Sequence, residues 1–185
     1  RAALRSPPHI TLQPPFRQPL DQSANLKQVL AEFASVYLPF PVGLNGFGCF
    51  LPRAVFVSVV ENQMLSTVRH DLIRTLIQNQ IVGPDEQPLR TFHPHVTIAF
   101  RDLIRCHFKS LWDEVEHKSF ADQFTADGIT LLQHNGKGWS AETDFPFRQE
   151  DADVRVVLEG LPHAREPSEQ CFSNFPKTFF GNLVL

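Results

Sequence analysis

A five-residue motif occurs twice in this chain and constrains the fold more than any other feature. Pro8-His9-Ile10-Thr11-Leu12 and Pro94-His95-Val96-Thr97-Ile98 both read Pro-His-(β-branched)-Thr-(aliphatic), and their histidines lie 86 positions apart (95 minus 9). In an extended strand, side chains two positions apart point to the same face. Each motif therefore predicts a strand that carries one imidazole and one hydroxyl on one face and aliphatic side chains on the other.

The repetition of the motif points to a shared site. A sequence of this composition would contain about 0.03 Pro-His-x-Thr strings by chance, so two copies indicate an internal repeat. A lone histidine on a strand is more often a surface or core residue than a catalytic one. Two strands of a repeated unit, related by a pseudo-twofold axis, would instead bring two histidines and two threonines into one cleft. We therefore predict one catalytic site formed by His9, Thr11, His95 and Thr97.

Hydrophobic patterns predict alternating strands and helices along the chain. The order strand, helix, strand, strand occurs twice, as expected for two related halves. In the helix over 24–37, the apolar stripe comprises Leu26, Val29, Leu30, Phe33 and Val36. The predicted strands cover 9–13, 42–51, 54–60, the second motif to about 102, 120–134 and 139–147, and the predicted helices cover 24–37, 63–80 and 108–117.

Length and composition indicate one domain followed by a tail. Of 185 residues, 42% are hydrophobic and 17 are Phe, which is sufficient for a packed core. We predict that residues 1–147 form this domain. Residues 148–185 differ in composition from this domain and are predicted to form a linker and a C-terminal tail. Within that tail, segment 177–185 is apolar enough to add a strand to the edge of a sheet.

Charge and cysteine content limit the partners. A net charge of −3 argues against a protein that coats long nucleic acid, including duplex DNA, and favours a small nucleotide or a single RNA end. Cys49, Cys106 and Cys171 form no Cys-x-x-Cys pattern, so neither disulfides nor zinc is indicated and we expect a cytoplasmic location. No apolar run reaches the length of a membrane span, so no membrane partner is expected.

Paired imidazoles suit reactions that need a general base and a general acid near neutral pH. If the two lie on opposite sides of one phosphate, one histidine deprotonates the nucleophile and the other protonates the leaving oxygen, so no cofactor or metal is required. The two threonine hydroxyls would donate hydrogen bonds to the non-bridging oxygens, where negative charge accumulates in the transition state.

These motifs resemble a known family. Together with Gly46-Phe47-Gly48-Cys49-Phe50 and Pro52-Arg53-Ala54-Val55-Phe56, they are similar to the 2H phosphoesterase superfamily, specifically its 2'-5' RNA ligase-like branch, over about residues 5–147. The resemblance implies a bilobal α+β fold with two antiparallel sheets, helices outside, and pseudo-twofold-related lobes around a central cleft.

The resemblance also implies an activity and roles for the motif residues. The activity is hydrolysis of 2',3'-cyclic phosphate on RNA ends or nucleotides, without metal or ATP, with reversible 2'-5' RNA ligation by the same groups. By position, His9 would be the proton donor and His95 the base that activates water. Thr11 and Thr97 would hold the phosphate.

Four further residues are candidates for substrate binding. Arg53 and Arg101 flank strands that should line the cleft and could bind phosphate, although a solvated surface role is equally compatible. Phe47 or Phe56 could stack on a base or a ribose. With 17 Phe in the chain, core packing is the more common role for any one of them.

Two alternative interpretations stay open. The chain could be a nucleotide- or RNA-binding module derived from such an enzyme and catalytically impaired. His93 and His95 could instead bind a metal, with His107 or His117 as a third ligand. The symmetric part of the repeat is His-x-Thr, which favours the metal-free interpretation. His70 and His134 have no companions in the sequence and are expected at the surface.

The chain departs from the family pattern at its start. The resemblance implies a strand and a helix before the first motif, whereas eight residues precede His9. A half-domain without that strand would leave an unpaired sheet edge. We expect segment 177–185 to fill the gap, either in the same chain or in a neighbouring one.

Overall fold

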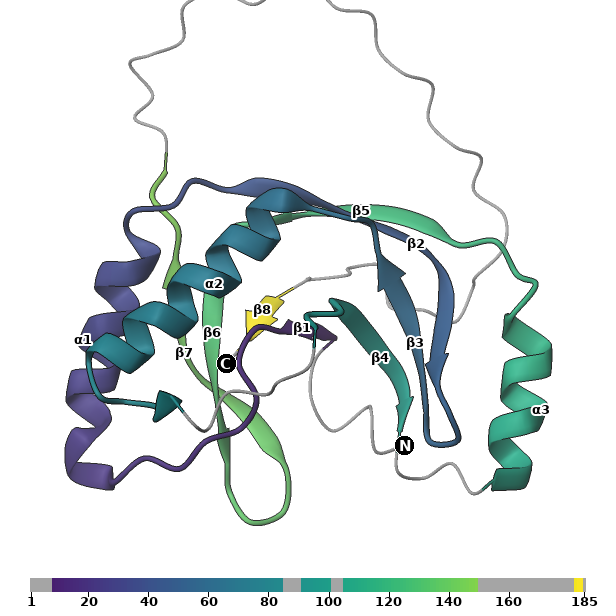
Figure 1. Ribbon diagram of the computed structural model, residues 1–185, viewed down its shortest axis with the longest axis horizontal. Helices are drawn as coiled ribbons and strands as arrows, with labels where there is room; N and C mark the ends of the chain where they lie inside the picture. Colours follow the sequence, from purple (N-terminus) through teal and green to yellow (C-terminus); the bar gives the residue numbers. More distant parts are fainter. Residues whose placement is uncertain (1–7, 85–90, 101–104, 150–181, 185) are drawn as a thin grey trace, which may run out of the picture.

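The computed structural model describes residues 8–84, 91–100, 105–149 and 182–184 (Figure 1). None of the helices in these ranges combines the length and the apolar character needed to cross a membrane. The helices are η2 (Leu20–Gln22, a 3-10 turn), α1 (Ser23–Ala34), α2 (Gln63–Gln78) and α3 (Arg105–Val115). The strands are β1 (His9–Thr11), β2 (Phe40–Phe50), β3 (Ala54–Val59), β4 (His95–Phe100), β5 (Ala121–Ala126), β6 (Gly128–His134), β7 (Trp139–Pro146) and β8 (Asn182–Val184).

The strands form one curled sheet in the order β5-β2-β3-β4-β1-β8-β6-β7. β8 runs parallel to β1 and to β6, and every other neighbouring pair in this order is antiparallel. α1 and α2 lie at one end of the molecule and α3 lies at the other (Figure 1). The predicted α+β fold is confirmed. The prediction divided the strands between two sheets, whereas one hydrogen-bonded sheet runs through all eight because β8 bridges β1 and β6.

β8 occupies the middle of the sheet although it is distant in sequence from both of its neighbours. It pairs with β1 in register, with His9 opposite Asn182 and Thr11 opposite Val184. On its other side, Leu183 lies opposite Ile129 of β6. Leu183 and Val184 are 0% and 1% exposed, so this short strand is part of the core. β8 belongs to segment 177–185, and the other residues of that segment lie outside the described ranges.

The strand predicted over 120–134 is two strands in the structure. β5 pairs with β2 at one end of the sheet, and β6 pairs with β8 and β7 at the other. Asp127 separates them, and its carbonyl oxygen accepts a hydrogen bond from the Phe147 amide at 2.7 Å. Both pieces have strand character, so the sequence pattern could not reveal that they pair with different neighbours.

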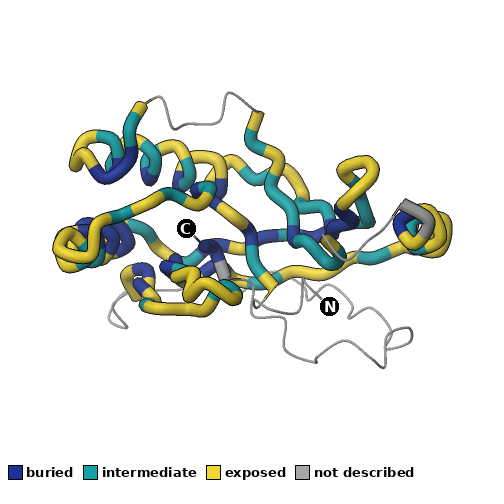
Figure 2. The backbone as a smooth tube through the Cα atoms, turned by 90° about the horizontal axis from the view of Figure 1, so that it is seen from below, coloured by how far each residue is buried: buried dark blue, intermediate teal, exposed yellow. Residues whose placement is uncertain are grey.

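Most of the core lies where α1 and α2 cover the sheet (Figure 2). The stripe predicted for α1 is confirmed except at Val36, which is 67% exposed because the helix ends at Ala34. On α2, the buried residues recur at helical spacing and begin at Leu65, whose amide donates a hydrogen bond to the Asn62 side chain at 3.0 Å. A second, smaller cluster packs α3 against Val55 of β3.

Candidate active site

The two His-x-Thr motifs lie side by side at the centre of the sheet. β1 and β4 are antiparallel neighbours, and Ile10 pairs with Val96, the middle residue of each motif. This register places the histidine of each motif opposite the threonine of the other: His9 opposite Thr97, and Thr11 opposite His95. Directly paired residues have Cβ atoms roughly 4.5–5.5 Å apart. Ile10 and Val96 are buried in the core, so the four polar side chains project from the opposite face, which we call the motif face.

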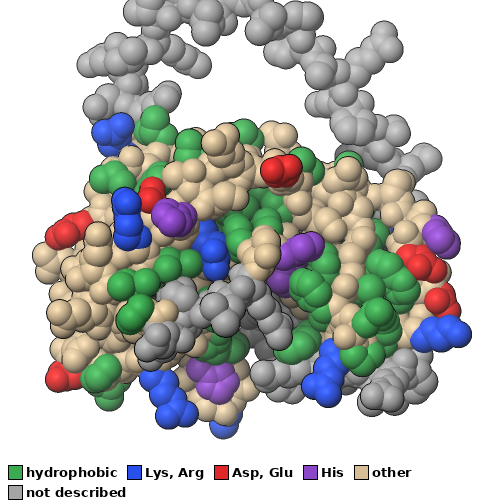
Figure 3. Space-filling view, viewed as in Figure 1, with side chains coloured by type: hydrophobic (Ala, Val, Ile, Leu, Met, Phe, Trp, Pro, Cys, Tyr) green, Lys and Arg blue, Asp and Glu red, His purple; other side chains and the backbone are tan. Residues whose placement is uncertain are grey.

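Strand β3 continues the motif face on the other side of β4. Phe56 lies opposite Thr97, and Ser58 lies opposite His95. The His95 ring packs against two aromatic rings, with centroid distances of 4.9 Å to Phe56 and 5.0 Å to Phe50. Figure 3 shows histidine side chains (purple) beside a hydrophobic area (green) near the start of β4. The rings of Phe50 and Phe56 thus pack against the His95 imidazole and limit its motion.

A hydrogen bond fixes how the His95 ring is oriented and where its proton lies. Nδ1 of His95 is 2.6 Å from the backbone carbonyl oxygen of His93. A carbonyl oxygen can only accept, so Nδ1 must carry the hydrogen. In the neutral ring, the proton-accepting lone pair then lies on Nε2. This is the arrangement that a general base requires.

The surroundings of His95 favour its neutral form. Burial lowers the pKa of the imidazole below its ordinary value, and the hydrogen bond to the His93 backbone partly opposes this. Positive charge on His93 or His9 lowers the pKa of His95 further. The effect of His9 means that the two motif imidazoles are within electrostatic reach of each other. His95 is therefore suited to act as the base while another group donates the proton.

A glycine makes room for the ring that supports His95. Gly48 pairs with Phe56 across β2 and β3, and a Cβ atom at position 48 would lie 2.3 Å from Cε2 of Phe56. Phe56 is 3% exposed and has little space to move away. The absence of a side chain at Gly48 thus allows the Phe56 ring to lie flat over β2 and against the histidine.

We expect Gly48→Ala to displace the Phe56 ring and loosen the packing of His95. Overpacking of this kind should lower the free energy of unfolding by about 1–3 kcal/mol. It should also raise the pKa of His95 toward its ordinary value, because the ring becomes more exposed to water. Denaturant unfolding and NMR titration of the histidine ring measure the two effects.

Gly138→Ala is the matched control, because a Cβ atom there would meet no atom within 4 Å. It should leave the pKa of His95 unchanged. An unchanged His95 titration in Gly48→Ala would mean that Phe56 does not support the imidazole.

Not all of the residues predicted to bind substrate lie on the motif face. Phe47 pairs with Val57 on the opposite face and packs against Phe120 with ring centroids 5.6 Å apart, so its ring lies on the core side of the sheet. Phe56 is on the motif face but lies beneath other rings. Arg53 is exposed in the turn between β2 and β3, where its amide donates to the Phe50 carbonyl at 2.9 Å. Arg101 lies outside the described residues.

The sequence analysis missed two contributions to the site. Phe50 is 44% exposed, and its ring contacts both His95 and His93. The signal for Phe50 was its position two residues after Gly48, which places both on one face of β2. His93 was considered only as a metal ligand, whereas its carbonyl oxygen orients His95. In the described part of the chain, no three His, Cys, Asp or Glu side chains gather closely enough to hold a metal ion, so neither His107 nor His117 completes such a site there.

Comparison with known proteins gives one consistent result. A family model described as the 2'-5' RNA ligase superfamily matches residues 1–138. Proteins of Geobacillus kaustophilus, Geobacillus thermodenitrificans and Bacillus cytotoxicus, each named "putative phosphoesterase", are 26%, 27% and 25% identical to this chain over 142 residues. Each alignment covers 75% of this chain and 78% of the relative. A crystal structure from Thermus thermophilus has the same fold, with a TM-score of 0.56, 20% identity, and coverage of 73% of this chain and 75% of that one.

Proposed function

Because this chain belongs to the 2'-5' RNA ligase superfamily, we propose that it is a metal-independent phosphodiesterase that opens 2',3'-cyclic phosphate on RNA ends or nucleotides. Reversible 2'-5' RNA ligation by the same groups is part of the proposal. The observation that carries it is the pairing of the two motifs on one face, with the His95 ring oriented through Nδ1 so that Nε2 can accept a proton. The names of the bacterial relatives agree with a phosphoesterase activity.

The proposed reaction is an in-line displacement at phosphorus. Nε2 of His95 removes a proton from water while the water oxygen forms a bond to phosphorus. One of the two ribose oxygens leaves as its bond to phosphorus breaks, and it takes a proton from the His9 imidazolium. The proton gained by His95 and the proton lost by His9 balance after exchange with solvent. In ligation, a ribose 5'-hydroxyl takes the place of water.

The threonines would stabilise the charge that builds up on the phosphate. Each hydroxyl stands opposite a histidine, so a phosphate held between His9 and His95 lies within reach of Thr11 and Thr97. Hydrogen-bond donors aimed at the non-bridging oxygens act more strongly in the transition state, where charge accumulates. Beside them, the exposed part of Phe50 offers an apolar surface for the nucleoside that bears the phosphate.

The direct test is hydrolysis of 2',3'-cyclic AMP in the presence of EDTA, followed by chromatographic separation of the products. We expect turnover to persist in EDTA, because the proposed acid and base are both side chains of the protein. Saturable binding of the nucleotide without turnover would show that the chain is a binding module. Loss of activity in EDTA and its return with added metal would show that the reaction is metal-dependent.

The pH profile of this hydrolysis should reflect the lowered pKa of His95. Protonated His95 cannot accept a proton, so kcat/KM should fall as pH drops through the pKa of His95. Because that pKa is lowered, the fall should begin below the value of about 6.5 that is typical of histidine. A second fall at higher pH is expected when the proton donor loses its proton, and the two apparent values belong to the pair. A flat profile from about pH 5 to 9 would contradict paired-histidine catalysis.

A further inference from the structure

The backbone carbonyl that orients His95 belongs to a segment that the sheet does not hold. Residues 91–94 precede β4 and lie outside every helix and strand. In the described part of the chain, their backbone groups form no hydrogen bond with another backbone group, and Pro94 has no N–H to donate. The position of the His93 carbonyl therefore depends on how the side chains of this segment are packed.

Two side chains on opposite sides of the sheet flank this carbonyl. Phe92 packs against the main core, and the guanidinium carbon of Arg69 on α2 lies 4.6 Å from the centre of its ring. His93 lies on the motif face, where its imidazole meets the rings of Phe50 and Phe56. Phe92 thus fixes the segment on the core side, and His93 fixes it on the side of the proposed active site.

The contacts of the His93 ring have the geometry that aromatic pairs prefer. The imidazole is edge-to-face with both phenylalanines, with ring centroids 5.6 Å from Phe50 at 72° and 5.5 Å from Phe56 at 71°. The same two rings lie 5.0 Å and 4.9 Å from the ring of His95. Both histidines are therefore positioned against one pair of phenylalanines, although His93 is exposed to solvent.

The two imidazoles also affect each other electrostatically. Their ring centroids are 6.2 Å apart, and a positive charge on His93 lowers the pKa of His95. The His93 side chain thus contributes both a packed ring and a charge, and two substitutions separate these contributions. His93→Phe keeps a ring of similar size and removes the charge, whereas His93→Ala removes both.

We propose that the His93 side chain is a positioning residue for the base of the reaction. Its ring, packed against Phe50 and Phe56, holds the His93 carbonyl where it accepts the Nδ1 hydrogen of His95, so that Nε2 keeps the lone pair. His93 does not contact the reacting atoms in this role. The inference rests on the proposed function and adds a residue that lies outside both His-x-Thr motifs.

The tautomer of His95 tests this role without any substrate. Heteronuclear NMR distinguishes a protonated from an unprotonated ring nitrogen, and the His95 signals are those that disappear in His95→Ala. The parent protein and His93→Phe should both carry the hydrogen on Nδ1. In His93→Ala, loss of the positioned carbonyl should shift the ratio of the two tautomers toward Nε2–H by about two- to tenfold, the range expected for one hydrogen bond.

Kinetics with 2',3'-cyclic AMP should rank the variants in the same order. A base that spends less time in the productive tautomer lowers kcat, so His93→Ala should lose about two- to tenfold in kcat. Its KM should stay close to that of the parent protein, because His93 is not proposed to bind the substrate. His93→Phe should keep the kcat of the parent when each protein is measured at its own pH optimum.

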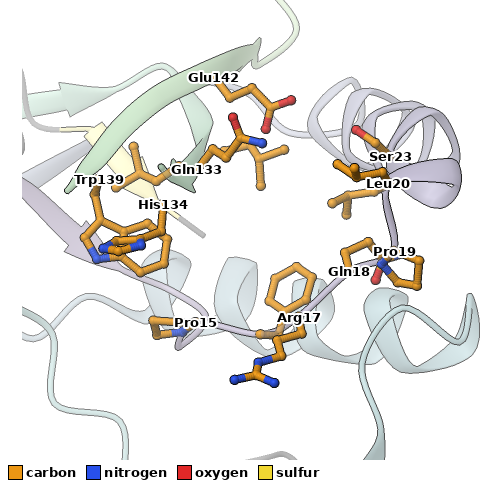
Figure 4. Close-up of a pocket in the computed structure, with 14 residues that line it drawn as sticks. Pro15, Arg17, Gln18, Pro19, Leu20, Ser23, Gln133, His134, Trp139 and Glu142 are labelled. Atoms are coloured by element: carbon orange, nitrogen blue, oxygen red, sulfur yellow. The ribbon is translucent and has the colours of Figure 1, made fainter. Parts of the chain in front are cut away.

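His134→Ala is the matched control. His134 is also exposed and also packs edge-to-face on an aromatic ring, that of Trp139, with centroids 5.0 Å apart at 64°. This pair lines a cavity beside the β6–β7 hairpin that no motif residue lines (Figure 4). Loss of the imidazole there should change neither the tautomer of His95 nor kcat.

Three outcomes would overturn the proposal. An unchanged tautomer in His93→Ala would show that the segment holds its carbonyl without the ring. Equal tautomer shifts in His93→Ala and His93→Phe would show that packing of the ring is not what holds it. A raised KM with an unchanged tautomer would show that His93 contacts the substrate instead. If the parent protein opens no cyclic phosphate while the tautomer still shifts in His93→Ala alone, the proposed function fails and the positioning role stands.

Discussion

Replacing His9 or His95 by alanine is expected to lower kcat for 2',3'-cyclic AMP by about 10²–10⁴-fold, the range typical for loss of a general acid or base. The two histidines lie on paired strands and face the same side of the sheet. One would remove a proton while the other delivers one, so neither can compensate for loss of the other. The measurement is steady-state hydrolysis with purified variants whose unfolding curves match that of the parent protein.

The double variant separates a catalytic pair from two independent contributions. If the histidines act in one concerted step, removing both should cost little more than removing one. His70→Ala on α2 is the matched control, since this histidine is exposed and lies on a helix away from the motif strands; it should keep full activity. Equal, small losses in all three single variants would leave the motif histidines without a catalytic role.

Leu183→Ala in β8 is expected to lower the free energy of unfolding by about 2–5 kcal/mol, the usual range for a large-to-small change in a core. Leu183 is 0% exposed and is paired on both sides, with Ile10 of β1 and Ile129 of β6. A cavity at this position would weaken the packing of β8 against β1 and β6, the two strands that it connects. It would also loosen β1, the strand that carries His9 and Thr11, so activity should fall with stability.

Leu20→Ala provides the control for the change in β8, because Leu20 is 86% exposed. Its effect on stability should stay within about 0.5 kcal/mol. A chain that ends at residue 149 should lose cooperative unfolding, and a synthetic peptide of residues 177–185 should restore it. Full stability and activity of the shortened chain without the peptide would show that β8 is dispensable.

The sequence predicted the motif face well, because a strand alternates its side chains with a fixed period. That period predicts that the histidine and the threonine of each motif lie on the same face of their strand, and the structure confirms this alternation on β1 and β4. The register between the two strands could not be predicted, since nothing in either motif specifies which residue lies opposite which. The same limit applies to β5 and β6, which look like one strand until their partners are known.

One extra residue in β2 explains why Phe47 lies on the core side of the sheet. Between Leu44 and Phe47 the register of β2 against β3 shifts, and Gly46 there has a φ of 67°. A one-residue shift moves every later side chain of a strand to the other face. Phe47 therefore points into the core, while Gly48 and Phe50 reach the motif face. The glycines were visible in the sequence, but their backbone angles were not.

The position of β8 has a consequence for how the protein is made. Leu183 follows its partner Ile10 by 173 positions (183 minus 10), so the ribosome completes β1 to β7 well before β8 emerges. During that interval a nascent chain holds β1 with one flank open, a state that invites pairing with other chains or with chaperones. Pairing over such a sequence distance is also slow to form. During synthesis, the strand that carries His9 and Thr11 would thus lack its β8 partner until translation has passed residue 184.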